Sequence, residues 1–390
     1  MNLEELRNFG LTENQVMIRE MARDFTDKEI IPHIDDYERE GRYPKEIISK
    51  LGPLGFLGCL IPEECGGAGL DYVSYGVVCE EIARGDWLSA SVISVQNSLV
   101  ATSLLNFGSS EEVKKRYLEH MARGEMISSA ALTEPNAGSD LASLETTATP
   151  TAGGYILNGA KMFISHANHA DVYFVLATLD RSLRHKGICA FIVERNSPGI
   201  ECKPIPMHCL RRGNTAEVSF QDVFVPKENL LGKEGEGFKV VGAALDRGRF
   251  SVASRAIGHA HACIDVSLKY ASERSQFGQV IGGFQMVQQM LADMISQTEA
   301  ARLIVRRVGQ LKNAGVERAS FEASMAKLMA GDNCVKVATD AVQIFGGYGL
   351  AEEFPVGRYF QEAKVFQIIE GTNQLQRILV AEYALGLRKY

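Results

Sequence analysis

The sequence predicts an α+β protein with an N-terminal all-helical domain, a central antiparallel β domain and a C-terminal four-helix bundle. Three observations predict this order. Apolar residues recur at helical spacing in the first third, short β-rich runs separated by turn residues fill the middle, and long helical runs follow Gly242. At 390 residues the chain is long enough for three domains, which we expect at residues 1–125, 126–241 and 242–390.

The N-terminal region opens with a helix-start signal. Thr12-Glu13-Asn14-Gln15 fits a capping box and precedes apolar residues at helical spacing. Further along, residues 88–105 predict a buried helix that carries polar side chains, among them Gln96. Buried polar groups need partners, so we expect this helix to face a ligand or another helix.

The middle region reads as strands and the last region as helices. Strands are predicted at 171–178, 188–193 and 217–220, and Asn158-Gly159 after a further β-rich run is a hairpin signal. Helices are predicted at 243–273, 284–314, 319–345 and 372–385, with glycine pairs marking the breaks.

Composition and motifs exclude several classes of function. The net charge of −7 argues against nucleic acid or an anionic membrane as partner, and no run approaches the roughly eighteen apolar residues of a membrane span. The acidic N-terminus is not a secretion signal. Eight cysteines without a Cys-x-x-Cys pair, and histidines without a His-Glu-x-x-His frame, predict no metal site. Phosphate-binding and dinucleotide-binding glycine fingerprints do not occur.

Glu370 is the strongest candidate for a catalytic residue. It follows Ile368 and Ile369 and precedes Gly371, and apolar surroundings raise the pKa of a carboxylate toward neutrality. A general base that removes a proton from carbon needs that property. The alternative is an acid in the first turn of a helix that only complements the helix dipole. From these residues alone both interpretations stay open.

Three further segments carry candidate ligand-binding groups. The turn from Thr133 to Asp140 brings backbone N–H groups and hydroxyls together, Phe163 lies beside Ser165, and Arg274 closes a long helix. Each has a simpler interpretation: a plain turn, an aromatic residue of a strand core, and a cation at a helix end.

Taken together and in this order, these motifs resemble the acyl-CoA dehydrogenase family over nearly the whole chain. The resemblance rests on residues 61–67, 132–140, 158–165, 225–229, 273–278, 343–349 and 370–374. It implies the three-domain fold, FAD bound without a covalent link, a homotetramer, and electron-transferring flavoprotein as the electron acceptor.

The resemblance also implies which residues contact FAD. The flavin is expected to lie against Leu132, Thr133, Gly138 and Ser139, with Phe163 and Ser165 beside its ring. The residues that reach the FAD of a neighbouring subunit are Arg274, Gln285, Gln343, Ile344, Gly346 and Gly347. Further FAD contacts are expected from Ile164, Gln276, Phe277, Thr372 and Gln374. Many relatives carry Trp at the position of Phe163.

The implied reaction is α,β-dehydrogenation of an acyl thioester. Glu370 takes the α-proton, the β-hydrogen leaves as hydride to flavin N5, and the base's own backbone N–H helps to hold the thioester oxygen. Some branches carry the base at the position of Gly248, where glycine cannot serve. The implied substrate contacts are Ser139, Asp246, Arg249, Gly371, Gln96 and Leu99. A local pair on a helix is the alternative interpretation of Asp246 and Arg249.

The substrate class is the least determined feature. The glutaryl-CoA branch holds its distal carboxylate with an Arg where this chain has Ala90, so a dicarboxylic acyl group would leave a charge unpaired on that helix. Ile369 stands where many straight-chain enzymes carry Tyr. We expect a short, branched or alicyclic acyl-CoA. The alternatives are a glutaryl-CoA dehydrogenase, a dehydrogenase linked to acyl-carrier protein, an enoyl-CoA reductase, an oxidase and a flavin-free binding protein. The expected location is a bacterial cytoplasm, or a mitochondrial matrix if a leader has been removed.

Overall fold

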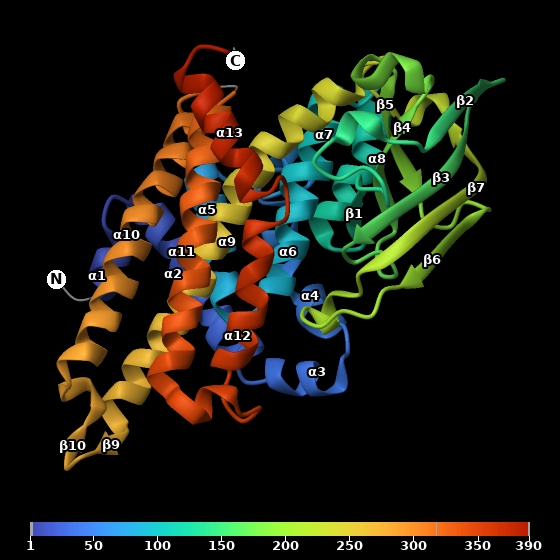
Figure 1. Cartoon of the computed structure of the whole chain (residues 1–390). Coiled ribbons are helices and arrows are strands. Elements are labelled where there is room, and N and C mark those ends of the chain that lie inside the picture. Colours follow the sequence, from blue (N-terminus) through green and yellow to red (C-terminus); the bar gives the residue numbers. More distant parts are fainter. Residues whose placement is uncertain (1–2, 317, 389–390) are drawn as a thin grey trace.

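The computed structural model describes residues 3–316 and 318–388, in which a β-sheet domain lies against a larger body of helices (Figure 1). Helices come first, strands follow, and helices return, which confirms the predicted fold class. The N-terminal helices are α1 (Leu3–Asn8), α2 (Glu13–Phe25), α3 (Ile34–Glu40), α4 (Lys45–Leu51), α5 (Tyr72–Gly85), α6 (Trp87–Ser94), α7 (Thr102–Phe107) and α8 (Glu111–Arg123). The strands of the main sheet are β1 (Ser128–Ala131), β2 (Thr147–Thr151), β3 (Gly154–Ile164), β4 (Val172–Thr178), β5 (Ile188–Glu194), β6 (Ile200–Pro204), β7 (Ala216–Pro226) and β8 (Leu230–Leu231). The C-terminal elements are α9 (Gly237–Glu273), the short strands β9 (Ser275–Gln276) and β10 (Gln279–Val280), α10 (Gln285–Asn313), α11 (Ser320–Phe345), α12 (Val356–Ala363) and α13 (Asn373–Ala384).

The predicted capping box at the start of α2 is present. The Thr12 hydroxyl accepts a hydrogen bond from the Gln15 backbone N–H at 3.3 Å, and the Gln15 side chain accepts one from the Thr12 backbone N–H at 3.0 Å. Two backbone donors that a helix start leaves without partners are thereby satisfied.

The expected buried helix is a continuous segment from Trp87 to Phe107 with a π-helical stretch, Val95–Ala101, between α6 and α7. Among the described residues, this is the one helix that is long and apolar enough, by length and composition, to cross a membrane. The expectation that no segment approaches a membrane span is therefore wrong. Since 89% of the apolar stretch is buried inside the protein, the segment serves here as a core helix.

The sheet is mainly antiparallel, with strand order β6-β7-β3-β2-β4-β5-β8, and β1 pairs with β4 in parallel. The predicted hairpin at Asn158-Gly159 is wrong, because β3 runs straight through it with a shift of register against β7. Gly159 is needed for packing instead. A Cβ atom there would lie 2.5 Å from the Thr146 hydroxyl. The turn that joins β2 to β3 comes earlier, at Gly153, whose φ is +85°.

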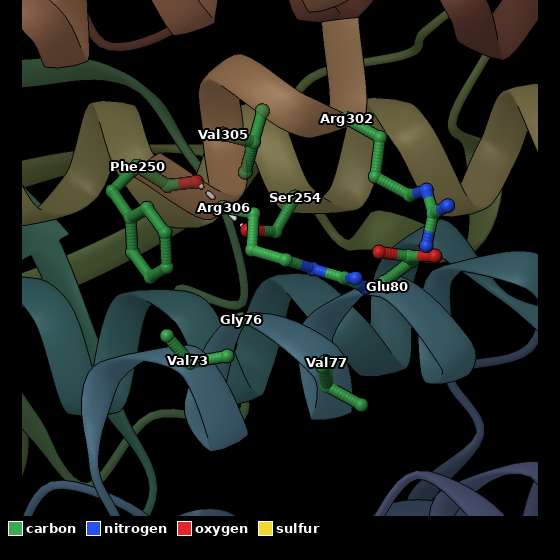
Figure 2. A pocket seen from close by; sticks show the side chains of 9 residues that line it. All are labelled: Val73, Gly76, Val77, Glu80, Phe250, Ser254, Arg302, Val305 and Arg306. Atoms are coloured by element: carbon green, nitrogen blue, oxygen red, sulfur yellow. Dashed lines mark hydrogen bonds between the residues drawn. The ribbon is translucent and has the colours of Figure 1, made fainter. Parts of the chain in front are cut away.

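In the C-terminal region α9 is the central helix, and α5, α10 and α11 pack around it (Figure 1). It begins at Gly237, six residues before the predicted start, and α12 was not predicted. Figure 2 shows a cavity between α5, α9 and α10 that is lined by Phe250, Glu80 and Arg302 among others. Its volume of about 20 Å³ has room for about one water molecule, so it is a packing defect rather than a substrate site.

Arg212 connects the sheet domain to both helical regions. Its side chain is 1% exposed, and its guanidinium contacts Asp86 at 2.9 Å, Glu362 at 3.3 Å and Glu38. Asp86 caps the start of α6, and Glu362 lies in α12. A buried cation shared by three acids from separate elements fixes how those elements sit against the sheet.

Candidate active site

Glu370 lies in the turn between the short helical segment Lys364–Gln367 and α13. Its φ of +53° and the +93° of Gly371 place two consecutive residues in the left-handed region, which is uncommon for a residue with a side chain. Lys327 of α11 holds this turn in place. Its ammonium donates to the Gly371 carbonyl and to the Asn373 side-chain oxygen, both at 2.8 Å.

The Glu370 carboxylate lies directly over the backbone of α9 at Gly248. A Cβ atom at Gly248 would be 1.6 Å from Glu370 Oε2 and 3.0 Å from Leu99 Cδ2. The absent side chain of Gly248 is therefore the space that the carboxylate occupies. Glu370, Gly248 and Leu99 come from three separate elements, and the fold brings them together at one point.

The carboxylate is poised to exchange a proton near neutral pH. Glu370 Oε2 is buried and has no hydrogen-bond partner. Burial raises the pKa of Glu370 to about 7, against the lowering effect of Arg255, Arg249 and Lys327. Desolvation outweighs three cations because none of them makes a direct ion pair with the carboxylate, as the contacts of the described residues show.

Lys327 shares the environment of Glu370. Burial lowers the pKa of its ammonium to about 7, and the Glu370 carboxylate opposes that shift. The side chain is nevertheless held by two neutral oxygens rather than by a carboxylate. The charges of Lys327 and Glu370 therefore influence each other's pKa although the two side chains form no ion pair.

Asp246 and Arg249 form the pair that the alternative interpretation expected. Arg249 Nη1 lies 3.4 Å from Asp246 Oδ1, and Asp246 also accepts a hydrogen bond of 2.5 Å from the Ser320 hydroxyl. Both side chains are buried, and Arg249 Nε has no partner. Their predicted contacts with substrate stay a prediction.

Gln96 does not fit its predicted role in substrate binding. Its side-chain amide donates to the Met121 carbonyl at 2.8 Å and to the Leu57 carbonyl at 3.3 Å, and its oxygen accepts from the Ser128 backbone N–H at 3.0 Å. The side chain is fully buried and all its polar groups have backbone partners. Gln96 therefore joins three backbone segments. Leu99, by contrast, lies against Gly248 at the site.

The two predicted flavin-facing segments of the sheet domain lie side by side, because the Met162 backbone N–H donates to the Thr133 carbonyl at 2.8 Å. The loop from Leu132 to Ser139 is fixed by a buried ion pair at 2.6 Å between Glu134 and Lys161, and Glu134 also accepts the backbone N–H groups of residues 145 and 146. Phe163 projects from the end of β3 with a φ of +60° and 59% of its side chain exposed. An exposed aromatic face at Phe163, and the open space where a Cβ at Gly138 would lie, fit a flat ligand such as FAD.

The remaining predicted FAD contacts lie at the opposite end of the helical body, where β9 and β10 project (Figure 1). Arg274 stacks over the Tyr348 ring at 5.3 Å, so the β9–β10 turn and the end of α11 form one surface. Phe277 is 96% exposed there. The other predicted residues of this surface are Gln276, Gln285, Gln343, Ile344, Gly346 and Gly347, of which Ile344 alone is buried.

Near Glu370, Thr372 caps α13 by accepting from the Leu375 backbone N–H at 3.3 Å, and Gln374 is exposed in its first turn. Sequence reasoning missed Lys327, Lys161 and Arg255. A lysine amid alanine and methionine in a helix is the one signal that could have singled out Lys327.

Comparison with known proteins identifies the family. Residues 12–125, 129–223 and 235–385 match the N-terminal, middle and C-terminal domains of acyl-CoA dehydrogenase. The chain is 43% identical to an acyl-CoA dehydrogenase of Bacillus subtilis, over 96% of this chain and 99% of the relative. It is 40% identical to the CarC subunit of the caffeyl-CoA reductase–Etf complex of Acetobacterium woodii, over 95% of this chain and 98% of the relative.

Two solved structures are similar in fold as well. A glutaryl-CoA dehydrogenase in complex with glutaryl-CoA matches with a TM-score of 0.95 at 37% identity, covering 98% of this chain and 97% of that one. The butyryl-CoA dehydrogenase of Megasphaera elsdenii matches with a TM-score of 0.94 at 39% identity, covering 97% and 99%. The chain therefore belongs to the acyl-CoA dehydrogenase family, whose cofactor is FAD.

Proposed function

We propose that the protein dehydrogenates a short, branched or alicyclic acyl-CoA between C2 and C3, with Glu370 as the base. One observation carries the proposal: the Glu370 carboxylate has a buried oxygen, Oε2, without a hydrogen-bond partner, its pKa is raised to about 7, and it lies against a glycine that leaves it room. Such a group takes up a proton at physiological pH, and a C–H bond next to a thioester carbonyl is the donor that acyl-CoA offers.

In this mechanism the fold supplies position and desolvation. Lys327 and Gly371 hold the turn that aims Glu370, and Gly248 and Leu99 form the wall against which its carboxylate rests. Removing water from the site strengthens the base and any donor to the thioester oxygen. When bound, FAD supplies the oxidant that accepts the hydrogen from C3. Leu132, Thr133, Gly138, Ser139 and the segment from Phe163 to Ser165 would hold it within this subunit.

The proposed substrate range follows from the side chains expected to surround the acyl group. Ile369 puts an aliphatic side chain next to the base, and Ala90 on the helix expected to line the acyl end is fully buried and uncharged. A compact acyl group fits such surroundings.

We also propose that the three domains of the chain comprise residues 1–125, 126–241 and 242–390.

We also propose electron-transferring flavoprotein as the electron acceptor, and a homotetramer as the working assembly. The similarity to CarC, a subunit of a complex with Etf, supports the first. The separation of the two predicted FAD surfaces within one subunit supports the second, because the surface at β9 and β10 lies away from the sheet domain and is free to meet the FAD of another copy (Figure 1). CarC also favours a second candidate function, reduction of an enoyl-CoA, in which Glu370 returns the proton to C2.

Anaerobic flavin bleaching tests the proposal. The purified protein is expected to be yellow, and addition of a suitable acyl-CoA from a panel of butyryl-, isobutyryl-, 2-methylbutyryl- and cyclohexanecarboxyl-CoA should bleach the flavin band. The Glu370→Gln variant, which keeps the side-chain shape, should retain FAD and lose bleaching by at least about 10³-fold. Full activity in this variant would refute the assignment of the base.

A further inference from the structure

Arg255 is a buried cation whose partner is missing from the described residues. It lies in α9, its side chain is 1% exposed, and its Nε and Nη2 atoms have no hydrogen-bond partner. It makes no ion pair within 4 Å to a described acid, and its guanidinium carbon lies 5.7 Å from the centre of the Phe366 ring. The low dielectric of the interior makes an unpaired guanidinium costly, so a fold keeps one only where something else pairs with it.

Arg255 lies along the same helix face as the catalytic centre. It comes seven residues after Gly248, which is two helical turns or about 10 Å along the axis. Between them, Ser251 donates to the Gly248 carbonyl and contacts the Ser94 hydroxyl at 2.6 Å, so this face of α9 looks toward the helix that carries Leu99. Phe366, over which Arg255 lies, precedes Glu370 by four residues.

The electrostatics place Arg255 within reach of the base. Apart from burial, its charge is the largest influence on the pKa of Glu370, and it lowers that pKa more than Arg249 or Lys327 does. A second polar atom without a partner lies in the same region. His166 Nδ1 is buried and unpaired while Nε2 contacts the Ser91 hydroxyl at 3.3 Å. Burial, together with the charge of Arg255, lowers the pKa of His166 to about 3.

We propose that Arg255 binds a carboxylate at the far end of the acyl group, so that the substrates of this enzyme are short acyl-CoA thioesters with an anionic tail. A planar guanidinium offers two parallel N–H donors, the geometry that a carboxylate accepts. The sequence disfavoured a dicarboxylic acyl group because the helix that carries Ala90 holds no cation. The structure supplies the cation from α9 instead. This inference rests on the proposed function and narrows its substrate class.

The experiment compares an anionic acyl-CoA with its neutral counterpart of equal shape. Glutaryl-CoA is paired with 5-methylhexanoyl-CoA, in which an isopropyl group replaces the carboxylate, and adipoyl-CoA is paired with 6-methylheptanoyl-CoA. For each pair, kcat/KM is measured with the FAD-loaded enzyme, and anaerobic bleaching of the flavin is followed in parallel. We expect the anionic member of at least one pair to be preferred by about 10- to 100-fold, the value of a hydrogen-bonded buried charge.

Variants assign the preference to the residue. Arg255→Met, similar in length and uncharged, should abolish or reverse the ratio within a pair mainly through KM, and Arg255→Lys should restore part of it. The matched control is Arg247→Met in the same helix. Arg247 bonds instead to the Tyr72 hydroxyl at 2.9 Å, so this variant should leave the ratio unchanged.

Two results would overturn the inference: equal or better use of the neutral members by the unaltered enzyme, or an unchanged preference in an Arg255→Met variant that still binds FAD. Should that variant lose FAD, Arg255→Gln replaces it. Failure of the proposed function has a different signature, because no acyl-CoA of either kind would then bleach the flavin.

Discussion

Replacing Gly248 by alanine tests how tightly the active site is built. The added Cβ would lie 1.6 Å from Glu370 Oε2, whereas ordinary contacts begin at 3.4 Å, so the carboxylate must move by close to 2 Å. A displacement of about 1 Å can cost 10²-fold in rate when a proton transfer depends on position. We expect Gly248→Ala to lower kcat by 10²-fold or more.

The fold itself should tolerate the change. The displaced atom is the end of a flexible side chain, and alanine in a helix interior is about 1 kcal/mol more favourable than glycine. Urea unfolding should therefore show stability equal to or above that of the unaltered protein, with flavin content retained. Gly242→Ala is the matched control, because a Cβ there meets no heavy atom nearer than Arg318 Nη2 at 4.0 Å. A Gly248→Ala enzyme with kcat within about threefold of the control would refute the placement of the base.

Three further outcomes are expected. Because Glu370 acts only when deprotonated and its pKa is raised to about 7, kcat/KM should fall about tenfold per pH unit below 7 and level off above it. Lys327→Met should move the midpoint of this profile to higher pH, since removing a cation raises the pKa of the base. An unmoved midpoint in the variant would contradict this. Lys161→Met should lower the free energy of unfolding by about 3–5 kcal/mol because Glu134 loses its buried partner. In the control Lys114→Met, which removes the surface ion pair with Glu111, the loss should be less than about 1 kcal/mol, and equal urea midpoints for the two variants would contradict the prediction. Arg274→Gln should reduce the FAD content of the purified protein without shifting the unfolding midpoint of protein stripped of FAD. Unchanged FAD content would show that the surface at β9 and β10 does not hold the cofactor.

The sequence predicted the features that depend on near neighbours in the chain. The capping box of Thr12 and Gln15 consists of local hydrogen bonds, so residue type and spacing are sufficient to predict it. The prediction of a hairpin at Asn158-Gly159 was wrong because Gly159 serves a packing need that comes from Thr146, thirteen residues away in the chain.

The site depends on contacts between distant segments, which local patterns do not reveal. Glu370 stood out by its apolar neighbours, but its raised pKa and its contact with Gly248 require α9 to pass beneath it. Gln96 looked like a ligand group because it is polar in an apolar helix, and three backbone groups brought by folding satisfy it instead. Arg255 gave no signal at all, since a lone arginine in a helix is normally a surface residue.

The wide turn at Val95–Ala101 has a consequence for how enzymes with this core diversify. A π-helical turn holds one residue more than an α-helical turn, so the side chains of α6 are rotated relative to those of α7 by that extra residue. Deleting a single residue from this turn would rotate the side chains of α6, up to Ser94, about the helix axis, while Leu99 kept its position. The surroundings of the base would thus change with the length of this turn alone, while Glu370, Gly248 and Leu99 stay as they are.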